Sequence, residues 1–280
     1  MPDDATQSRM TFAVDIAREA DELILRFYQH PELAVELKSD ASPVTVADRE
    51  AERLMRERIS ETFPDDAILG EEFGEKSGTS GWRWILDPVD GTKSFVHGVP
   101  LFGTLIGVEK DGRAEVGVCC MPALNEIAYA GTGLGCWWQQ RGEEPVKSQV
   151  STTDKLSDAL VCYTSYRYFS ASGEAAVIEA LRDNCRITRG WGDCYGHLLV
   201  ATGRADVIVE PALHPWDAAA LIPLVREAGG HFLDWNGQES FETGNGMSVN
   251  NALRDEVLSL VQKHKSSQTQ ASHMGRVGGA

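Results

Sequence analysis

The stretch "WILDPVDGTKSF" (residues 84–95) joins an apolar, strand-like segment to two acidic residues and a Gly-Thr pair. Asp87 and Asp90 lie three residues apart, with Pro88 and Val89 between them. Asp-Pro and Asp-Gly are common turn dipeptides, so a plain turn is one interpretation. Two carboxylates and the carbonyl oxygen of Val89 also form a set of hard oxygen ligands of the kind that Mg²⁺ prefers. The stretch therefore predicts a turn, a magnesium site, or both.

Gly91 and Thr92 follow the two acids directly. A glycine lets the backbone approach a ligand closely because it has no Cβ. Backbone amides at the start of a helix can receive a phosphate group. If a helix begins at this point, the amides of Gly91 and Thr92 would face an anion beside the predicted metal site.

Further acidic residues are ambiguous when each is taken alone. Asp217 opens the helical pattern "DAAALIPLVREAGG", where it is either an N-cap or a carboxylate aimed from the helix start toward a cleft. Glu71 and Glu72 follow a predicted strand in "ILGEEFG", where solvated loop acids are the simpler interpretation. Lys38 and Asp48 flank "SDASPVTV" and are uninformative individually.

The elements that must position these residues follow from periodicity and turn signals. Apolar residues at helical spacing predict an amphipathic helix over residues 10–29, and a second helix from about Thr45 to near Pro64. "AILG" reads as a strand that ends in a Gly/Ser loop. Apolar runs alternate with "KDG" and "TGLG" turns over residues 101–147, a pattern typical of an antiparallel meander.

From about Ser151 the pattern changes to alternating strands and helices. The predicted strands are "ALVCYTSY", "CRITRG", "ADVIVE" and "HFLDW", and the predicted helices are "GEAAVIEALRD", "CYGHLLVATG" and "WDAAALIPLVREAGG". We therefore expect a half over residues 1–150 that carries the acidic motifs, and an α/β half over residues 151–262 that carries Asp217. The polar segment 263–280 is expected to be a disordered tail.

Composition and charge exclude several classes of protein. Of the 280 residues, 42% are hydrophobic and 24% charged, as in ordinary globular proteins, and no apolar run approaches the length of a membrane span. The net charge of −16 and the lack of a basic run argue against nucleic-acid binding. The first residues lack the apolar core of a signal peptide, and the six cysteines form no C-x-x-C pair. We expect reduced thiols and a cytoplasmic location.

Three stretches together resemble the signatures of the inositol-monophosphatase-like family of Mg²⁺-dependent, Li⁺-sensitive phosphatases. They are "GEE" (70–72), "WILDPVDGT" (84–92) and "WDAAAL" (216–221), in the family's order and separation. The resemblance covers roughly residues 10–262. It implies an α/β fold of alternating α-β-α-β-α layers, with a largely antiparallel first sheet and the active site between two halves. It also implies a small-molecule phosphate ester as substrate, and family members are commonly homodimers.

The resemblance assigns roles residue by residue. Glu71, Asp87 and the Val89 carbonyl match the ligands of a first Mg²⁺, and Asp87, Asp90 and Asp217 match those of a second; a third, weaker ion leans on Glu71. Further matched roles are catalytic and substrate-binding: Asp48 and Thr92 as a hydrogen-bonded pair that positions the attacking water, with Gly91 and Thr92 as the amides that hold phosphate. Metal ions supply the positive charge that an anionic monoester requires and activate the water.

Two rivals lead to different predictions. Phosphatases that form an aspartyl-phosphate carry D-x-D-G-T, in which the two acids point the same way because they are i and i+2 on a strand. Asp87 and Asp90 are i and i+3, and the extra residue is expected to turn them apart. The second rival is a catalytically inactive relative that acts as a binding protein. All matched acids are present, which argues against it.

The substrate is indicated by residues outside the metal motifs. The block "WGDCYG" (residues 191–196) resembles the histidinol-phosphate phosphatases of the family, with Asp193 where inositol phosphatases carry a small neutral residue. Glu210 stands at a family position that contacts the alcohol moiety. Two carboxylates suit a cationic alcohol through charge-assisted hydrogen bonds. Histidinol phosphate is thus the predicted substrate, with inositol-1-phosphate or a broader range of esters as the alternative.

Simpler interpretations remain for some of these residues. Asp193 is also a candidate helix N-cap, a role that is compatible with binding substrate. Tyr163, Trp191 and Tyr195 are aromatic residues that would either stack on an imidazole or belong to the core. The pair Trp137-Trp138 is expected to serve packing or a dimer contact.

Overall fold

The computed structural model of the protein describes residues 4–30, 35–37 and 43–266. Its helices are α1 (Asp4–Leu25), α2 (Val46–Thr62), α3 (Thr92–Val96), α4 (Tyr166–Ala171), α5 (Ala175–Asn184), α6 (Asp193–Ala201), α7 (Pro215–Ala218), α8 (Leu221–Glu227) and α9 (Arg254–His264). The strands of the first half are β1 (Val35–Leu37), β2 (Pro43–Thr45), β3 (Ala67–Gly70), β4 (Gly74–Lys76), β5 (Trp82–Asp90), β6 (Gly103–Lys110), β7 (Arg113–Met121), β8 (Glu126–Gly131), β9 (Gly135–Gln140) and β10 (Val146–Lys147). Those of the second half are β11 (Leu160–Cys162), β12 (Ile187–Arg189), β13 (Val207–Glu210), β14 (His231–Leu233) and β15 (Gly246–Val249).

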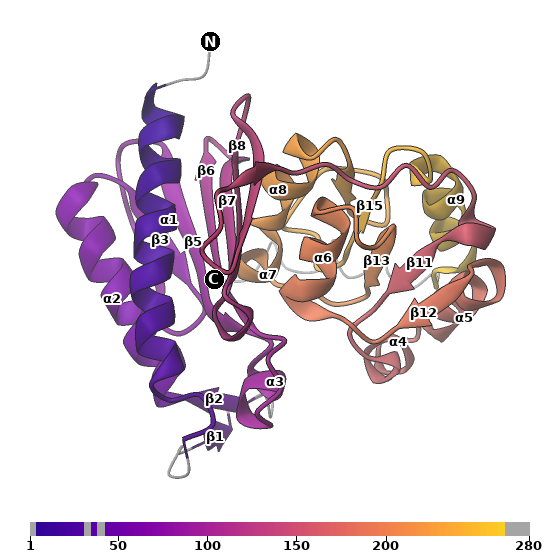
Figure 1. Ribbon diagram of the computed structural model, residues 1–280, viewed down its shortest axis with the longest axis horizontal. Helices are drawn as coiled ribbons and strands as arrows, with labels where there is room; N and C mark the ends of the chain where they lie inside the picture. Colours follow the sequence, from indigo (N-terminus) through magenta and orange to yellow (C-terminus); the bar gives the residue numbers. More distant parts are fainter. Residues whose placement is uncertain (1–3, 31–34, 38–42, 267–280) are drawn as a thin grey trace, which may run out of the picture.

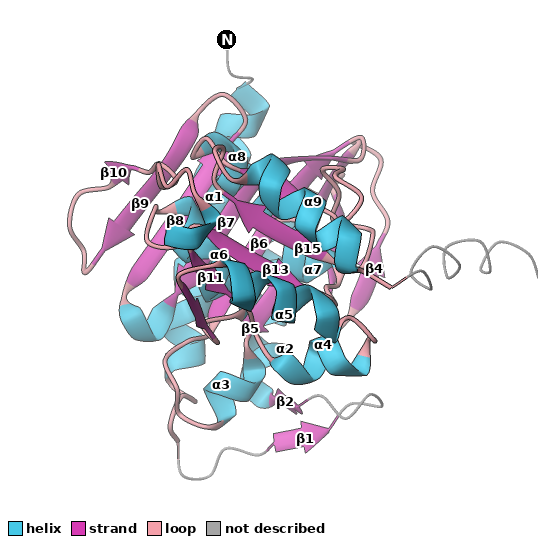
Figure 2. Ribbon diagram, turned by 90° about the vertical axis from the view of Figure 1, so that its right-hand side faces the viewer, coloured by secondary structure: helices cyan, strands magenta, loops and turns pink. Residues whose placement is uncertain are grey.

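Five layers follow one another across the molecule, as the resemblance implies (Figure 1). Helices α1 and α2 cover one face of the first sheet, and α6, α7 and α8 cover the other. Behind these three helices lies the second sheet, whose outer face is covered by α5 and α9 (Figure 2). The predicted α-β-α-β-α architecture is confirmed.

The first sheet has the strand order β10-β9-β8-β7-β6-β5-β3-β4. Its neighbours are antiparallel except for β3 and β5, which are parallel. The predicted meander over residues 101–147 is therefore confirmed. In the second sheet, of order β12-β11-β13-β15-β14, the first three strands are parallel and the last two pairings are antiparallel. The sequence pattern had not revealed β15, which lies between β13 and β14.

Local sequence explains where several helices begin and end. Thr45 is the N-cap of α2, and its hydroxyl accepts the Ala47 N–H at 3.1 Å, as the predicted start near Thr45 requires. The stretch predicted as one helix from Asp217 divides into α7 and α8. Pro223 explains the division, because it has no N–H to donate to the carbonyl of Ala219.

Two glycines allow the middle helical layer to lie directly on the first sheet. Gly107 and Gly117 are paired across β6 and β7. A Cβ on Gly117 would lie 1.9 Å from the carbonyl oxygen of Ala220, and one on Gly107 would lie 2.8 Å from the Cβ of Ala219. Any larger residue would push the α7–α8 junction, and Asp217 with it, off the sheet.

The last helix extends slightly into the segment that was predicted to be a disordered tail. Lys263 and His264 still belong to α9, whereas the predicted tail began at residue 263. The remainder of that tail, residues 267–280, lies outside the described residues, as does Lys38.

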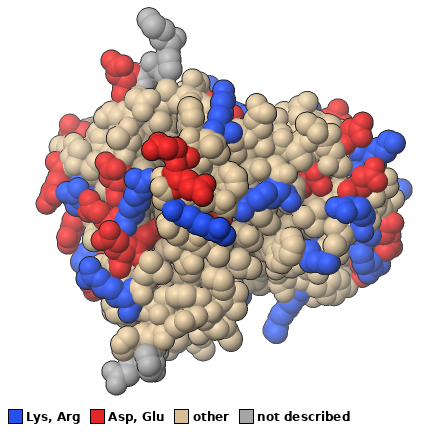
Figure 3. Space-filling model, in the orientation of Figure 1, with Lys and Arg blue, Asp and Glu red and all other residues tan. Residues whose placement is uncertain are grey.

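The surface carries charges of both signs, and most of the thiols lie in the interior. On the face drawn in Figure 3, acidic and basic side chains are interspersed, without a continuous basic stripe. All six cysteines are free, and five of them are buried. None of the helices in the described ranges is long and apolar enough to cross a membrane.

Candidate active site

A β-bulge at the end of β5 brings the two motif aspartates together. Asp87 lies opposite Leu105 on β6 and Asp90 opposite Gly103, so three steps along β5 match two along β6. Residues three apart on a regular strand face opposite sides, and the extra residue of the bulge reverses this. The expectation that the i, i+3 spacing turns the two acids apart is therefore wrong. That directional argument against the aspartyl-phosphate motif no longer holds, although the motif itself still differs.

Asp217 completes a group of three acids with Asp87 and Asp90. One carboxylate oxygen of each residue lies within 4.8 Å of the others. Asp217 is the third residue of α7 and not its N-cap, which is His214. Its Oδ2 atom accepts the His214 N–H at 2.8 Å, so one oxygen closes the helix start while the carboxylate faces the other two acids. The capping and ligand interpretations of Asp217 are thus compatible.

The electrostatics of this group fit a bound cation. Burial raises the pKa of Asp87 well above its ordinary value, and the charges of Glu71, Asp90 and Asp217 raise it further. Burial also raises the pKa of Asp90, with the charges of Asp193 and Asp217 added, and it raises the pKa of Asp217 to about 6. Buried like charges are costly without a counter-ion. A divalent cation held by these oxygens would offset that cost, and carboxylates are its preferred ligands.

Glu71 and Val89 border the same group. The Glu71 N–H donates to the carbonyl of Leu86 at 3.2 Å, which continues the parallel pairing of β3 with β5 and places Glu71 beside Asp87. A hydrogen bond between the Glu71 and Asp87 side chains is among the causes of the raised pKa of Asp87. Val89 donates its N–H to Asp87 Oδ1 at 3.1 Å, which orients that carboxylate.

Asp48 and Thr92 each have a partner other than the expected one. The Thr92 hydroxyl donates to the carbonyl oxygen of Val89 at 3.0 Å. Asp48 Oδ2 accepts the N–H and the hydroxyl of Thr45, at 2.8 and 2.6 Å. Because a hydroxyl has one hydrogen to donate, Thr92 does not donate to Asp48 in this structure, contrary to the expected pair. Burial raises the pKa of Asp48 to about 6, and the nearby charges of Glu72 and Glu71 contribute.

A short helix, α3, begins directly after the motif, which meets the condition set for the amides of Gly91 and Thr92. Gly91 is the N-cap of α3 and has a φ of 82°, in the left-handed region that favours glycine. A Cβ at this position would lie 2.9 Å from the carbonyl oxygen of Leu101 and 3.4 Å from Asp193 Oδ2. Gly91 is therefore required both by its backbone conformation and by the close approach of the neighbouring chain.

Asp193 is the first residue of α6, and Gly192, not Asp193, is its N-cap. Its φ of 52° is uncommon for a residue with a side chain, although aspartate tolerates this region better than most. The next amide, the N–H of Cys194, donates to Asp90 Oδ2. The start of α6 thus connects the acid group to the region predicted to bind the substrate.

Thr164 joins the two acids that were predicted to recognise the substrate. Its hydroxyl oxygen accepts the N–H of Asp193 at 2.7 Å, and its hydroxyl donates to Glu210 Oε1 at 2.5 Å. Both acids are poorly solvated: burial raises the pKa of Asp193 to about 6 and that of Glu210 well above its ordinary value. The charge of Lys93 acts in the opposite direction on Asp193. The structure brings Asp193 and Glu210 together as one acidic pair.

The sequence reasoning had missed Thr164, although a signal for it existed. Strands β11 and β13 are parallel, with Cys162 opposite Ile208, so residues two further along, Thr164 and Glu210, are neighbours at the carboxyl ends of both strands. Polar residues that follow adjacent parallel strands are candidates for one site. Lys93, in the "DGTKSF" stretch, was also missed; its ring partner is Tyr168, with Nζ 4.6 Å from the ring centroid.

The aromatic residues have different surroundings. Tyr163 packs edge-on against Phe169 in the core of the second half. Trp191 is 39% exposed. Trp138 donates its indole N–H to Glu126 at 2.6 Å and lies under the guanidinium of Arg204. Glu126 and Trp138 belong to the first sheet and Arg204 follows α6, so Trp138 serves internal packing, one of the two interpretations proposed for Trp137-Trp138.

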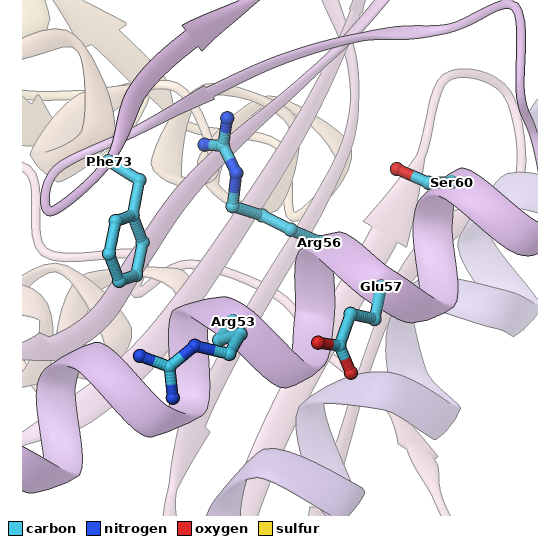
Figure 4. Close-up of a pocket in the computed structure, with 5 residues that line it drawn as sticks. All are labelled: Arg53, Arg56, Glu57, Ser60 and Phe73. Carbon is cyan, nitrogen blue, oxygen red and sulfur yellow. The ribbon is translucent and has the colours of Figure 1, made fainter.

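A surface hollow of about 400 Å³ lies elsewhere, over α2 and the turn after β3 (Figure 4). It is lined by Arg53, Arg56, Glu57, Ser60 and Phe73, none of which is a predicted site residue. The chemistry of the acid group is therefore not located in this hollow.

Comparisons with known proteins agree with these observations. The model of the inositol monophosphatase family matches residues 6–266. A histidinol-phosphatase of Chlorobaculum parvum is 43% identical over 253 residues, covering 90% of this chain and 96% of that protein. A histidinol-phosphatase of Mycobacterium tuberculosis is 36% identical, covering 89% and 96%. The structure of an inositol monophosphatase from Zymomonas mobilis superimposes with a TM-score of 0.80 at 32% identity, covering 93% of this chain and all of that one.

Proposed function

Since the chain belongs to the inositol monophosphatase family, we propose that it is a Mg²⁺-dependent phosphate monoester hydrolase whose substrate is histidinol phosphate. The observation that carries the substrate is the acidic pair of Asp193 and Glu210, joined by Thr164. The histidinol-phosphatases among the relatives support the same substrate.

Two or three Mg²⁺ ions would be held by the acid group. Glu71, Asp87 and the carbonyl oxygen of Val89 would bind one ion, and Asp87, Asp90 and Asp217 would bind another. A third, more weakly bound ion would be coordinated by Glu71. When bound, Mg²⁺ supplies positive charge for the phosphate oxygens and for the leaving alkoxide, and it activates water for attack.

The chain's own residues would place the reactants. The Thr92 hydroxyl donates its hydrogen to the carbonyl oxygen of Val89, so the lone pairs of the hydroxyl oxygen would be free to accept a hydrogen bond from the attacking water. Asp48, with a pKa of about 6, would be ionised at neutral pH and would orient the same water. The amides of Gly91 and Thr92, at the start of α3, would donate to the phosphate. These roles require no covalent nucleophile.

The leaving group would be recognised by charge. Histidinol carries an ammonium group and an imidazole, and buried carboxylates gain most from a cationic partner. Inositol offers neutral hydroxyls and would leave Asp193 and Glu210 uncompensated. The second candidate function, hydrolysis of inositol-1-phosphate, is favoured by the superposition on the Zymomonas enzyme, which is an inositol monophosphatase.

The test compares kcat/KM for the two esters with Mg²⁺ present. Wild-type protein should prefer histidinol phosphate. Asp193→Asn keeps the shape of the side chain but removes its charge. It should lower kcat/KM for histidinol phosphate by roughly 10-fold to 150-fold, which corresponds to the 1.5–3 kcal/mol of a hydrogen bond to a charged group. The same variant should change the rate on inositol-1-phosphate little.

Equal losses on both substrates would mean that Asp193 only stabilises the start of α6. A wild-type preference for inositol-1-phosphate would support the second candidate. No hydrolysis of either ester, by folded protein with Mg²⁺, would favour an inactive binding protein.

A homodimer in the cytoplasm is also part of the proposal, on the basis of the family resemblance and the reduced cysteines. Light scattering at several protein concentrations would test the dimer, and a monomer throughout would contradict it.

A further inference from the structure

Glu52, on α2, is a charged side chain with no exposed surface, and the roles assigned so far do not use it. Its carboxylate lies inside the tight turn that connects β3 to β4. Gly70 and Gly74 pair across this turn, and residues 71–73 form its tip. A Cβ on Gly70 would lie 2.0 Å from Glu52 Oε1, so Gly70 must be a glycine for the carboxylate to fit.

The carboxylate binds the backbone of the turn at two points. Glu52 Oε2 accepts the N–H of Glu72 at 2.7 Å, and Oε1 accepts the N–H of Phe73 at 3.2 Å. Arg56, one helical turn along α2, pairs with Oε1 at 3.0 Å and also donates to the carbonyl oxygen of Gly74 at 2.9 Å. Glu52 and Arg56 together tie the tip of the turn, and Gly74 at its second end, to α2.

Glu71 is fixed from the other side as well. Its own N–H donates to the carbonyl of Leu86 on β5, and the next two amides, of Glu72 and Phe73, donate to Glu52 on α2. Glu71 is therefore held by the sheet on one side and by α2 on the other. Its carboxylate faces Asp87, whose own charge would repel it when both are ionised. A turn that was free to move would relieve this repulsion by carrying Glu71 away from the acid group.

We propose that Glu52 is a positioning residue for the Mg²⁺ site: by binding the amides of Glu72 and Phe73, it holds Glu71 beside Asp87 so that the two carboxylates can share an ion. The inference rests on the proposed function, since it takes Glu71 as a ligand. Outer groups that orient metal ligands commonly contribute 10-fold to 100-fold to metal affinity.

The test uses Glu52→Gln, which keeps the shape but turns an NH₂ group toward one of the two amides. The control is Glu57→Gln, the same change at an exposed position of the same helix. Two quantities are measured for each: the Mg²⁺ concentration that gives half-maximal rate, and the Mg²⁺ concentration at which Tm rises, which reports binding without turnover. Both concentrations should increase roughly 10-fold to 100-fold in Glu52→Gln and stay unchanged in Glu57→Gln.

A purely structural role predicts a different result. Glu52→Gln would then lower Tm in the presence of a chelator, yet both Mg²⁺ concentrations would equal those of the wild type, and the inference would be overturned. If Glu52→Gln does not fold, Arg56→Gln decides, because it removes the outer tie and leaves the two amide bonds in place. A several-fold increase in both Mg²⁺ concentrations supports the inference, and no increase overturns it.

Failure of the proposed function would look different again. In that case the wild-type protein itself would show neither Mg²⁺-dependent hydrolysis nor a Mg²⁺-dependent rise in Tm. A wild type that responds to Mg²⁺ and a Glu52→Gln variant that responds at the same concentrations would contradict the positioning role alone.

Discussion

Acidification should destabilise this protein through His197, a buried histidine on α6. The residue is 1% exposed, its ring Nδ1 lies 2.7 Å from the Ser248 hydroxyl, and its Nε2 has no hydrogen-bond partner among the described residues. A second ring proton would therefore be buried as a charge without an acceptor. Burial lowers the pKa of His197 from 6.5 to about 3.

The magnitude follows from proton linkage. Below pH 6.5 the unfolded chain binds a proton at this histidine, whereas the folded chain does not until about pH 3. The free energy of unfolding therefore falls as the pH decreases through this window. Between pH 7.5 and pH 5 the loss from this one group is about 2 kcal/mol, from RT ln(1 + 10^1.5) with the ordinary pKa of 6.5.

The substitution His197→Asn isolates this contribution. Asparagine can still bind Ser248 but does not titrate, and the cavity that it leaves costs the same at every pH. Buried acids such as Asp21, with a pKa of about 7, change stability in the opposite sense, but they do so equally in both proteins. The difference between wild type and variant should therefore shrink by about 2 kcal/mol from pH 7.5 to pH 5.

Urea unfolding with a chelator present, at pH 5, 6 and 7.5, measures this difference. Parallel stability curves for wild type and His197→Asn would refute the reasoning. They would show that the folded protein accommodates the imidazolium, by an internal acceptor or by admitted water.

Two further predictions concern the acid group and the layer that carries part of it. Gly117→Ala should lower the free energy of unfolding by about 1–3 kcal/mol, because its Cβ would overlap the Ala220 carbonyl, and it should lower kcat about 100-fold by displacing Asp217. Urea unfolding and steady-state rates measure the two effects. The control is Gly190→Ala, because the nearest atom to an added Cβ there is 3.9 Å away. A fully active Gly117→Ala variant would contradict the packing argument. Asp90→Asn should raise the unfolding free energy in chelator by about 1 kcal/mol, because it removes a buried like charge, while it lowers the Mg²⁺-supported rate by at least about 100-fold. A variant that is active at saturating Mg²⁺ would remove Asp90 from the ligand set.

The ends of several helices are determined by short stretches of sequence. The N-cap of α2 at Thr45, the turn after "DPVD" and the start of α3 depend on groups within a few residues of one another. The same is true of the division between α7 and α8, for which Pro223 alone supplies the reason, although the pattern had predicted one helix. Interactions between residues that are close in the sequence can be predicted from it, because their spacing along the chain largely fixes the distance between them.

The sequence by itself determined which acids to expect at the site, since the types and order of Glu71, Asp87, Asp90 and Asp217 were sufficient to predict a metal site. Only the tertiary structure decided how they meet. The bulge in β5 appears only when β6 lies beside it, and Thr164 becomes a neighbour of Glu210 only through the parallel register of β11 and β13. Glu52 reaches the turn after β3 from a separate helix. Each of these contacts joins segments that are distant in the chain, and its geometry depends on the packing of whole layers, which no local spacing records.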